Sequence, residues 1–187
     1  MGKAGSKLSP ADLKDFKSCS HFTEKEISDF YSNFHKAYPK GRMSSDELQA
    51  MYAKLFPDGD ANEFAENVFR VIDQDGDGTV DFREYLVSMS ATLHGSPLEI
   101  LRRAFVLYDV DGDGFITEDE MSSIFMSYHR LRGGSGSLDQ SAKSIIRQFD
   151  TNHDQKLSFE EFVQCAQKMP KIVDQMMAQR RTSVASK

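Results

Sequence analysis

The sequence predicts an all-α fold made of four helix–loop–helix units arranged in two pairs. The first observation is a repeat: helical segments flank a twelve-residue loop, and the unit returns about every 35–40 residues along the 187-residue chain. The second is an apolar residue at position 8 of every loop, which predicts short antiparallel β pairing of the first loop with the second and of the third with the fourth. These residues are Met43, Val80, Ile116 and Leu157. We therefore expect an N-terminal pair in residues 1–94 and a C-terminal pair in residues 95–187.

The third loop, residues 109–120, has the most complete pattern. Carboxylates stand at positions 1, 3 and 5, a glycine at position 6 and a glutamate at position 12. Ca²⁺ takes six to eight oxygen ligands, and this spacing supplies them, so the loop has the pattern of an EF-hand calcium site. The expected ligands are Asp109, Asp111, Asp113, the carbonyl of Phe115, Thr117 or a water, and Glu120. An acidic surface turn is the alternative, and the length of the pattern disfavours it.

The second loop, residues 73–84, carries the highest charge of the four. Its expected ligands are Asp73, Asp75, Asp77, the carbonyl of Thr79, Asp81 through a water, and Glu84. The helix that enters it should start at Asp60, with Glu63 three residues on, and should bury a stripe at helical spacing. That stripe consists of Phe64, Val68, Phe69 and Ile72. We expect this loop to bind Ca²⁺ as well.

The other two loops depart from the pattern. In the fourth, residues 150–161, Gln155 replaces the glycine at position 6, and a non-glycine residue at φ > 0 costs roughly 1 kcal/mol. Its expected ligands are Asp150, Asn152, Asp154, the carbonyl of Lys156, Ser158 and Glu161, and we expect weaker binding there. A loop that folds without metal is the alternative. The first loop, residues 36–47, has lysines at positions 1 and 5, which repel Ca²⁺, so we expect no metal in it.

The N-terminal segment matches the pattern for N-myristoylation of Gly2, with Ser6 at the required place. A plain flexible tail is the alternative. One myristoyl chain gives only marginal membrane binding, so hiding or exposing it would move the protein on or off a membrane. A short helix capped by Ser9 and Asp12 should follow, and then a second helix opened by Thr23 and Glu26.

Composition excludes several classes of function. The formal charge of −6 argues against a nucleic-acid-binding protein. Cys19 and Cys165 are far apart, so we expect ordinary thiols in a reducing cytoplasm. No stretch approaches the ~20 apolar residues of a membrane span. We find no catalytic constellation, no phosphate-cradling glycine loop and no zinc-ligand spacing, and therefore do not expect an enzyme.

These motifs together resemble the neuronal calcium sensor family of recoverin/visinin/neurocalcin-like EF-hand proteins. The resemblance extends to about residue 169 and rests on the Gly2 and Ser6 start, residues 22–26, the degenerate first loop with Pro39 and Gly41, residues 51–57 and residues 107–114. Two departures are Tyr38, where the family usually has cysteine, and Phe30, where tryptophan is common. They leave the expected metal sites unaffected.

The resemblance implies a cytoplasmic, reversibly membrane-associated calcium sensor. Ca²⁺ would release the myristoyl group and uncover an apolar groove in the N-terminal half, which takes a helix of a target protein. The matching groove positions are Phe22, Phe30, Phe34, Tyr52, Leu55, Phe56, Phe69, Phe82, Tyr85 and Leu86. Targets of the receptor kinase, guanylate cyclase, channel and lipid kinase classes remain open, as does a homodimer. A calcium buffer with little conformational response is the alternative function.

The C-terminal tail carries an apolar stripe. It consists of Ile172, Val173, Met176 and Met177. At helical spacing these residues would form one face of a helix. In relatives such a helix can gate the target groove, and permanent packing on its own domain is the alternative.

Overall fold

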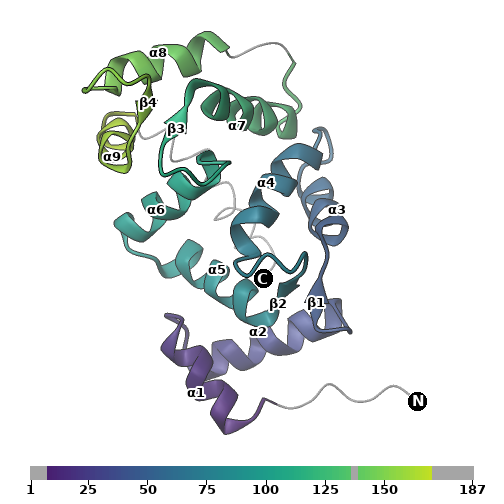
Figure 1. The fold of residues 1–187 in the computed structure, drawn as a ribbon. Helices are drawn as coiled ribbons and strands as arrows, with labels where there is room; N and C mark the ends of the chain where they lie inside the picture. Colours follow the sequence, from purple (N-terminus) through teal and green to yellow (C-terminus); the bar gives the residue numbers. More distant parts are fainter. Residues whose placement is uncertain (1–7, 136–138, 170–187) are drawn as a thin grey trace.

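The order of helices and strands follows the predicted repeat (Figure 1). The computed structural model describes residues 8–135 and 139–169. Its helices are α1 (Pro10–Ser18), α2 (Glu24–Ala37), α3 (Ser45–Leu55), α4 (Asn62–Ile72), α5 (Phe82–His94), α6 (Pro97–Tyr108), α7 (Glu118–Leu131), α8 (Asp139–Phe149) and α9 (Phe159–Lys168). The predicted myristoylation site Gly2 and the apolar stripe of the tail lie outside the described residues.

The strands pair as the apolar residue at position 8 predicted. β1 (Arg42–Met43) lies antiparallel to β2 (Val80–Asp81), with Met43 opposite Val80. β3 (Ile116–Thr117) lies antiparallel to β4 (Lys156–Leu157), with Ile116 opposite Leu157. All four position-8 side chains are at most 1% exposed. The pairing therefore fixes each loop beside its partner and anchors both in the core. The all-α fold with four EF-hands in two pairs is confirmed.

Most helix starts are set by local sequence. Capping boxes open α1, α2, α3, α5, α6, α7 and α9. In each box a side-chain oxygen accepts a backbone N–H of the first turn, and an acidic side chain three residues on accepts the N-cap N–H. The predicted boxes at Ser9 and Thr23 are both present.

The predicted start of α4 at Asp60 was two residues too early. The helix begins at Asn62, with Ala61 as an N-cap that makes no side-chain hydrogen bond. Asp60 still accepts the Asn62 backbone N–H at 3.0 Å, but the Asp60 N–H donates to the Arg130 carbonyl at 2.9 Å. Glu63 forms an ion pair with Arg130 and makes no capping box. Contacts with α7, which is remote in sequence, thus replace the local cap.

All of the residues matched to the target groove except Leu55 belong to the core or pack against it. Phe22, Phe34, Tyr52, Phe69, Phe82 and Leu86 are buried, and Phe30, Leu55, Phe56 and Tyr85 are half-buried. Phe82 lies among three rings of two other helices, with centroids 5.0 Å from Phe16 of α1 and 4.9 and 5.6 Å from Tyr31 and Phe34 of α2. The first turn of α5 is therefore packed directly against α1 and α2, which lie at the same end of the molecule in Figure 1.

Candidate calcium centres

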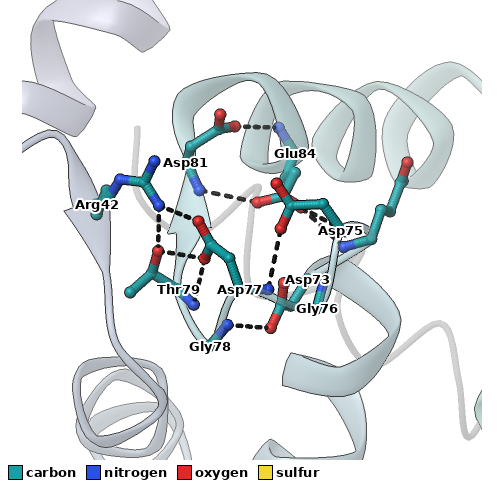
Figure 2. Close-up of polar contacts among 10 residues, drawn as sticks. Arg42, Asp73, Asp75, Gly76, Asp77, Gly78, Thr79, Asp81 and Glu84 are labelled. Atoms are coloured by element: carbon teal, nitrogen blue, oxygen red, sulfur yellow. Dashed lines mark hydrogen bonds and ion pairs between the residues drawn. The ribbon is translucent and has the colours of Figure 1, made fainter.

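The second loop gathers three of its predicted ligands. Carboxylate oxygens of Asp73, Asp75 and Glu84 lie within 4.8 Å of one another. Glu84, at position 12, is buried: its Oε1 accepts the backbone N–H groups of Gln74 and Asp75, at 2.8 and 3.3 Å. Its Oε2 accepts the Asp81 N–H at 3.0 Å, which makes Glu84 a capping residue of α5 as well (Figure 2). The loop thus converges oxygen atoms alone, the donor set that Ca²⁺ prefers.

The third loop repeats this arrangement. Oxygens of Asp109, Asp111 and Glu120 lie within 4.8 Å of one another. Asp109 is 7% exposed; its Oδ2 accepts the Gly114 N–H at 3.1 Å, but its buried Oδ1 has no hydrogen-bond partner. A buried carboxylate oxygen without a partner is costly, and a cation in the loop would satisfy it. The residues present therefore fit a hard divalent cation.

Hydrogen bonds keep the closing glutamate of the third loop ionised. Burial alone would raise the pKa of Glu120, but N–H and O–H donors from Thr117 and the N–H groups of Asp111 and Val110 outweigh it and lower that pKa. Thr117 donates from N at 2.8 Å and from Oγ1 at 2.7 Å. A charged carboxylate at position 12 is the state that a Ca²⁺ site requires.

The fourth loop satisfies its acidic groups internally. Glu161 accepts from Thr151 N and Oγ1 at 2.8 and 2.6 Å, and from Ser158 N and Oγ, both at 2.9 Å. Burial would raise the pKa of Glu161, yet these donors lower it to about 2. Among the described residues, Asp150, Asp154 and Glu161 do not form a cluster of three converging carboxylates, and Asn152 supplies an amide oxygen at position 3 in place of a charge.

The loop backbones show a second conformational constraint that was not predicted from the sequence. Positions 4 and 6 both hold positive φ: 70° and 81° at Gly76 and Gly78, and 74° and 86° at Gly112 and Gly114. In the fourth loop the same positions are His153 at 63° and Gln155 at 68°. The signal was present in the repeated Gly-Asp-Gly of the second and third loops. The fourth loop therefore holds two strained residues, where one was expected.

The first loop keeps the backbone turn of the repeat but lacks its metal-ligating side chains. Gly41 at position 6 has φ of 75°, as in the acidic loops. Glu47, at position 12, accepts the Ser44 N–H at 2.8 Å and caps α3. No group of metal-ligating side chains is found here within the described part of the chain.

The predicted ligands at positions 5 and 9 do not join the clusters. Asp77 and Asp113, both at position 5, are absent from the two groups of converging oxygens. Asp81 and Thr117, at position 9, accept the backbone N–H of Glu84 and Glu120 and act as N-caps. Each acidic loop therefore brings together positions 1, 3 and 12.

Comparison with known proteins agrees with this geometry. Two models described as an EF-hand domain pair match residues 39–92 and 99–167. Human recoverin is 35% identical over 166 residues, covering 84% of this chain and 83% of its own length. The chain belongs to the neuronal calcium sensor family. Neuronal calcium sensor 1 of Lymnaea stagnalis is 36% identical over 180 residues (92% of this chain and 94% of its own), and S-modulin of Aquarana catesbeiana is 32% identical over 166 residues (84% and 82%).

Family membership supports a calcium-sensor role and confirms that the chain is not an enzyme. The two acidic clusters and both domain-pair matches support calcium binding. Across residues 8–135 and 139–169, no helix has the length and apolar character needed to cross a bilayer. Cys19 and Cys165 are both free thiols, as expected from the cysteine count.

Proposed function

We propose that this neuronal calcium sensor exposes the aromatic core of its N-terminal half when Ca²⁺ binds, and thereby regulates a membrane-associated target protein. The observation that carries the proposal is the shared position of Glu84 and Phe82 in the first turn of α5. Glu84 is a candidate ligand, and Phe82 lies against Phe16, Tyr31 and Phe34. A movement of the first turn of α5 on Ca²⁺ binding would therefore carry Phe82 with Glu84 and rearrange the aromatic cluster.

The second and third loops would hold the ions through the ligand sets predicted from sequence. When bound, Ca²⁺ supplies two positive charges that offset the mutual repulsion of the loop carboxylates. Asp73, Asp75 and Glu84 of the second loop, and Asp109, Asp111 and Glu120 of the third, already converge. We place a third, weaker site in the fourth loop, where His153 and Gln155 hold strained backbone.

The two halves have separate roles in this proposal. Residues 1–94 form the half that receives an amphipathic helix of the target, and residues 95–187 form the half that holds the third and fourth loops. The domain-pair matches at 39–92 and 99–167, one in each half, support the division. Myristoylation of Gly2 would give the protein reversible membrane attachment in the cytoplasm, since one acyl chain binds a bilayer only marginally.

An apolar dye tests the opening directly. We expect dye fluorescence to rise when Ca²⁺ is added to the wild-type protein, because the aromatic cluster becomes accessible. Glu84→Gln should abolish most of the rise, whereas the matched variant Glu161→Gln in the fourth loop should retain it. Bound Ca²⁺ with unchanged dye fluorescence would instead identify a calcium buffer.

Vesicle sedimentation tests the membrane part. Acylated protein should sediment with vesicles more in Ca²⁺ than in chelator if the acyl chain is released on binding. Gly2→Ala cannot be acylated and should stay in the supernatant in both conditions. Equal sedimentation of acylated protein with and without Ca²⁺ would contradict a calcium-controlled release.

A further inference from the structure

In the second loop, the position-5 carboxylate is held by a cation of the first loop. Arg42 Nη1 forms an ion pair with Asp77 Oδ2 and donates to Thr79 Oγ1 at 2.7 Å (Figure 2). The other oxygen, Asp77 Oδ1, accepts from Thr79 N at 2.9 Å and Thr79 Oγ1 at 2.6 Å. Both oxygens of Asp77 are therefore occupied, and the side chain stands outside the cluster of Asp73, Asp75 and Glu84.

The C-terminal pair contains the same device. Lys156 Nζ lies 3.2 Å from Asp113 Oδ2, while Asp113 Oδ1 accepts the Phe115 N–H at 2.8 Å. The Lys156 ammonium is also 4.7 Å from the centre of the Phe115 ring. Asp113, like Asp77, stands outside the converging cluster of its loop. In both pairs the position-5 carboxylate thus forms an ion pair with the partner loop, although the cation is a guanidinium in one pair and an ammonium in the other.

The equivalence is positional. Arg42 is position 7 of the first loop and Lys156 is position 7 of the fourth, and Asp77 and Asp113 are both position 5 of the acidic partner loop. The strand pairs place each cation there, since Arg42 is opposite Asp81 and Lys156 is opposite Thr117. In each pair, the loop with the weaker ligand set supplies a cation to the loop with the stronger one.

We propose that Arg42 and Lys156 are positioning residues that compete with Ca²⁺ for the position-5 carboxylate and thereby lower the calcium affinity of the second and third loops. The inference rests on the proposed calcium function of these loops. Two effects explain why the cation lowers the calcium affinity. The ion pair stabilises the loop before Ca²⁺ binds, and the cation repels a second positive charge held by the same carboxylate. The first and fourth loops would in this way set the calcium threshold of their partners.

The test uses the full chain with one calcium loop left active. Glu120→Gln and Glu161→Gln together leave the second loop, and its Ca²⁺ affinity is measured by competition with a chelator. We expect Arg42→Gln to tighten binding by about 3- to 10-fold, and Arg42→Lys to restore the parent affinity because the charge is kept. The advantage of Arg42→Gln should shrink in ~1 M KCl, where exposed charges are screened. Arg42 and Asp77 are partly exposed, with side chains 52% and 35% accessible, so folding is expected to persist.

The third loop provides a second measurement. With Glu84→Gln and Glu161→Gln as background, Lys156→Gln should tighten binding in the same direction. The inference would be overturned if Arg42→Gln and Lys156→Gln bound Ca²⁺ no more tightly than their single-loop parents. It would also be overturned if the gain in affinity were the same at low and high salt. Either result would leave the proposed function intact. Failure of both single-loop parents to bind Ca²⁺ would overturn the proposed function and the inference together.

Discussion

At the scale of single residues, the two left-handed positions of each loop decide where backbone strain falls. Cβ atoms at Gly76, Gly78, Gly112 and Gly114 would meet nothing within 4 Å, so the constraint there is conformational and not one of space. Histidine is several-fold enriched among non-glycine residues at positive φ, and glutamine is not among the enriched residues. Gln155 therefore carries more of the strain in the fourth loop than His153.

Gln155→Gly should stabilise the protein. Removing a Cβ from a residue with φ of 68° relieves roughly 1 kcal/mol of strain, partly offset by the greater freedom of glycine in the unfolded chain. We expect the free energy of unfolding in chelator to rise by up to about 0.5 kcal/mol, measured by urea denaturation. Gln155→Ala keeps the Cβ and should leave the stability unchanged; an equal gain in that variant would contradict the strain explanation.

The thiol of Cys165 should resist modification in the native protein. The side chain is fully buried, and burial raises the pKa of the thiol to about 12. At pH 8 the folded protein therefore holds only about 1 thiolate in 10⁴ at this position, and the thiolate is the reactive form. In a Cys19→Ser background, a thiol reagent should label the protein slowly until denaturant is added. Labelling at the rate of a free cysteine would show that α9 opens readily.

At the scale of helices and strands, capping boxes link helix stability to acidic side chains. The cap of α6 is one that lies outside the calcium loops: Glu99 accepts the Ser96 N–H at 2.7 Å, and Ser96 Oγ accepts the Glu99 N–H at 3.3 Å. The first of these contacts is the main reason that the pKa of Glu99 is lowered. A group with a lowered pKa stabilises the fold above its unfolded pKa and loses that contribution as the pH falls through its folded pKa.

Ser96→Ala should cost about 1 kcal/mol of unfolding free energy at pH 7. Part of this cost should disappear as the pH falls through the lowered pKa of Glu99, because the bond between the Ser96 hydroxyl and the charged Glu99 carboxylate, which the substitution removes, is then lost in the wild type as well. Urea denaturation at several pH values measures this. Ser123→Ala, on the exposed face of α7, is the matched control and should not lower the stability. If the stability lost in Ser96→Ala were the same at every pH, the charge of Glu99 would not contribute to the cap.

Local sequence predicted the features that depend on neighbours in the chain. The boxes at Ser9 and Thr23 and the strand pairing through Met43, Val80, Ile116 and Leu157 are of this kind, because each follows from a fixed spacing. The start of α4 was wrong because Glu63 pairs with Arg130, 67 residues away in sequence. The ion pair between Arg42 and Asp77 was missed for the same reason. The spacing shows which loops pair, but which side chains meet across the pair depends on the folded backbone.

At the scale of the whole molecule, contacts between remote helices connect the loops of the two halves. α4 lies beside α6 and α7. Gly59 approaches the end of α7 so closely that a Cβ would lie 1.8 Å from the Leu131 carbonyl oxygen, and the Phe64 and Tyr128 rings are 5.7 Å apart. Arg70 reaches furthest: its Nη2 donates to the carbonyls of Val106 and Leu107 at 3.1 and 2.9 Å, and its Nη1 donates to the Asp109 carbonyl at 3.2 Å.

Arg70→Met should therefore weaken both stability and communication between the halves. Arg70 lies three residues before Asp73, the first residue of the second loop, and its guanidinium binds the end of α6 at Asp109, the first residue of the third. Losing charged hydrogen bonds to these carbonyls should cost about 1.5–3 kcal/mol of unfolding free energy. Calcium titrations with and without Glu120→Gln should show that an intact third loop changes the affinity of the second in the wild type and has less effect in Arg70→Met. Arg147→Met, at an exposed position of α8, should keep the wild-type coupling; unchanged coupling in Arg70→Met would mean that the halves communicate by another route.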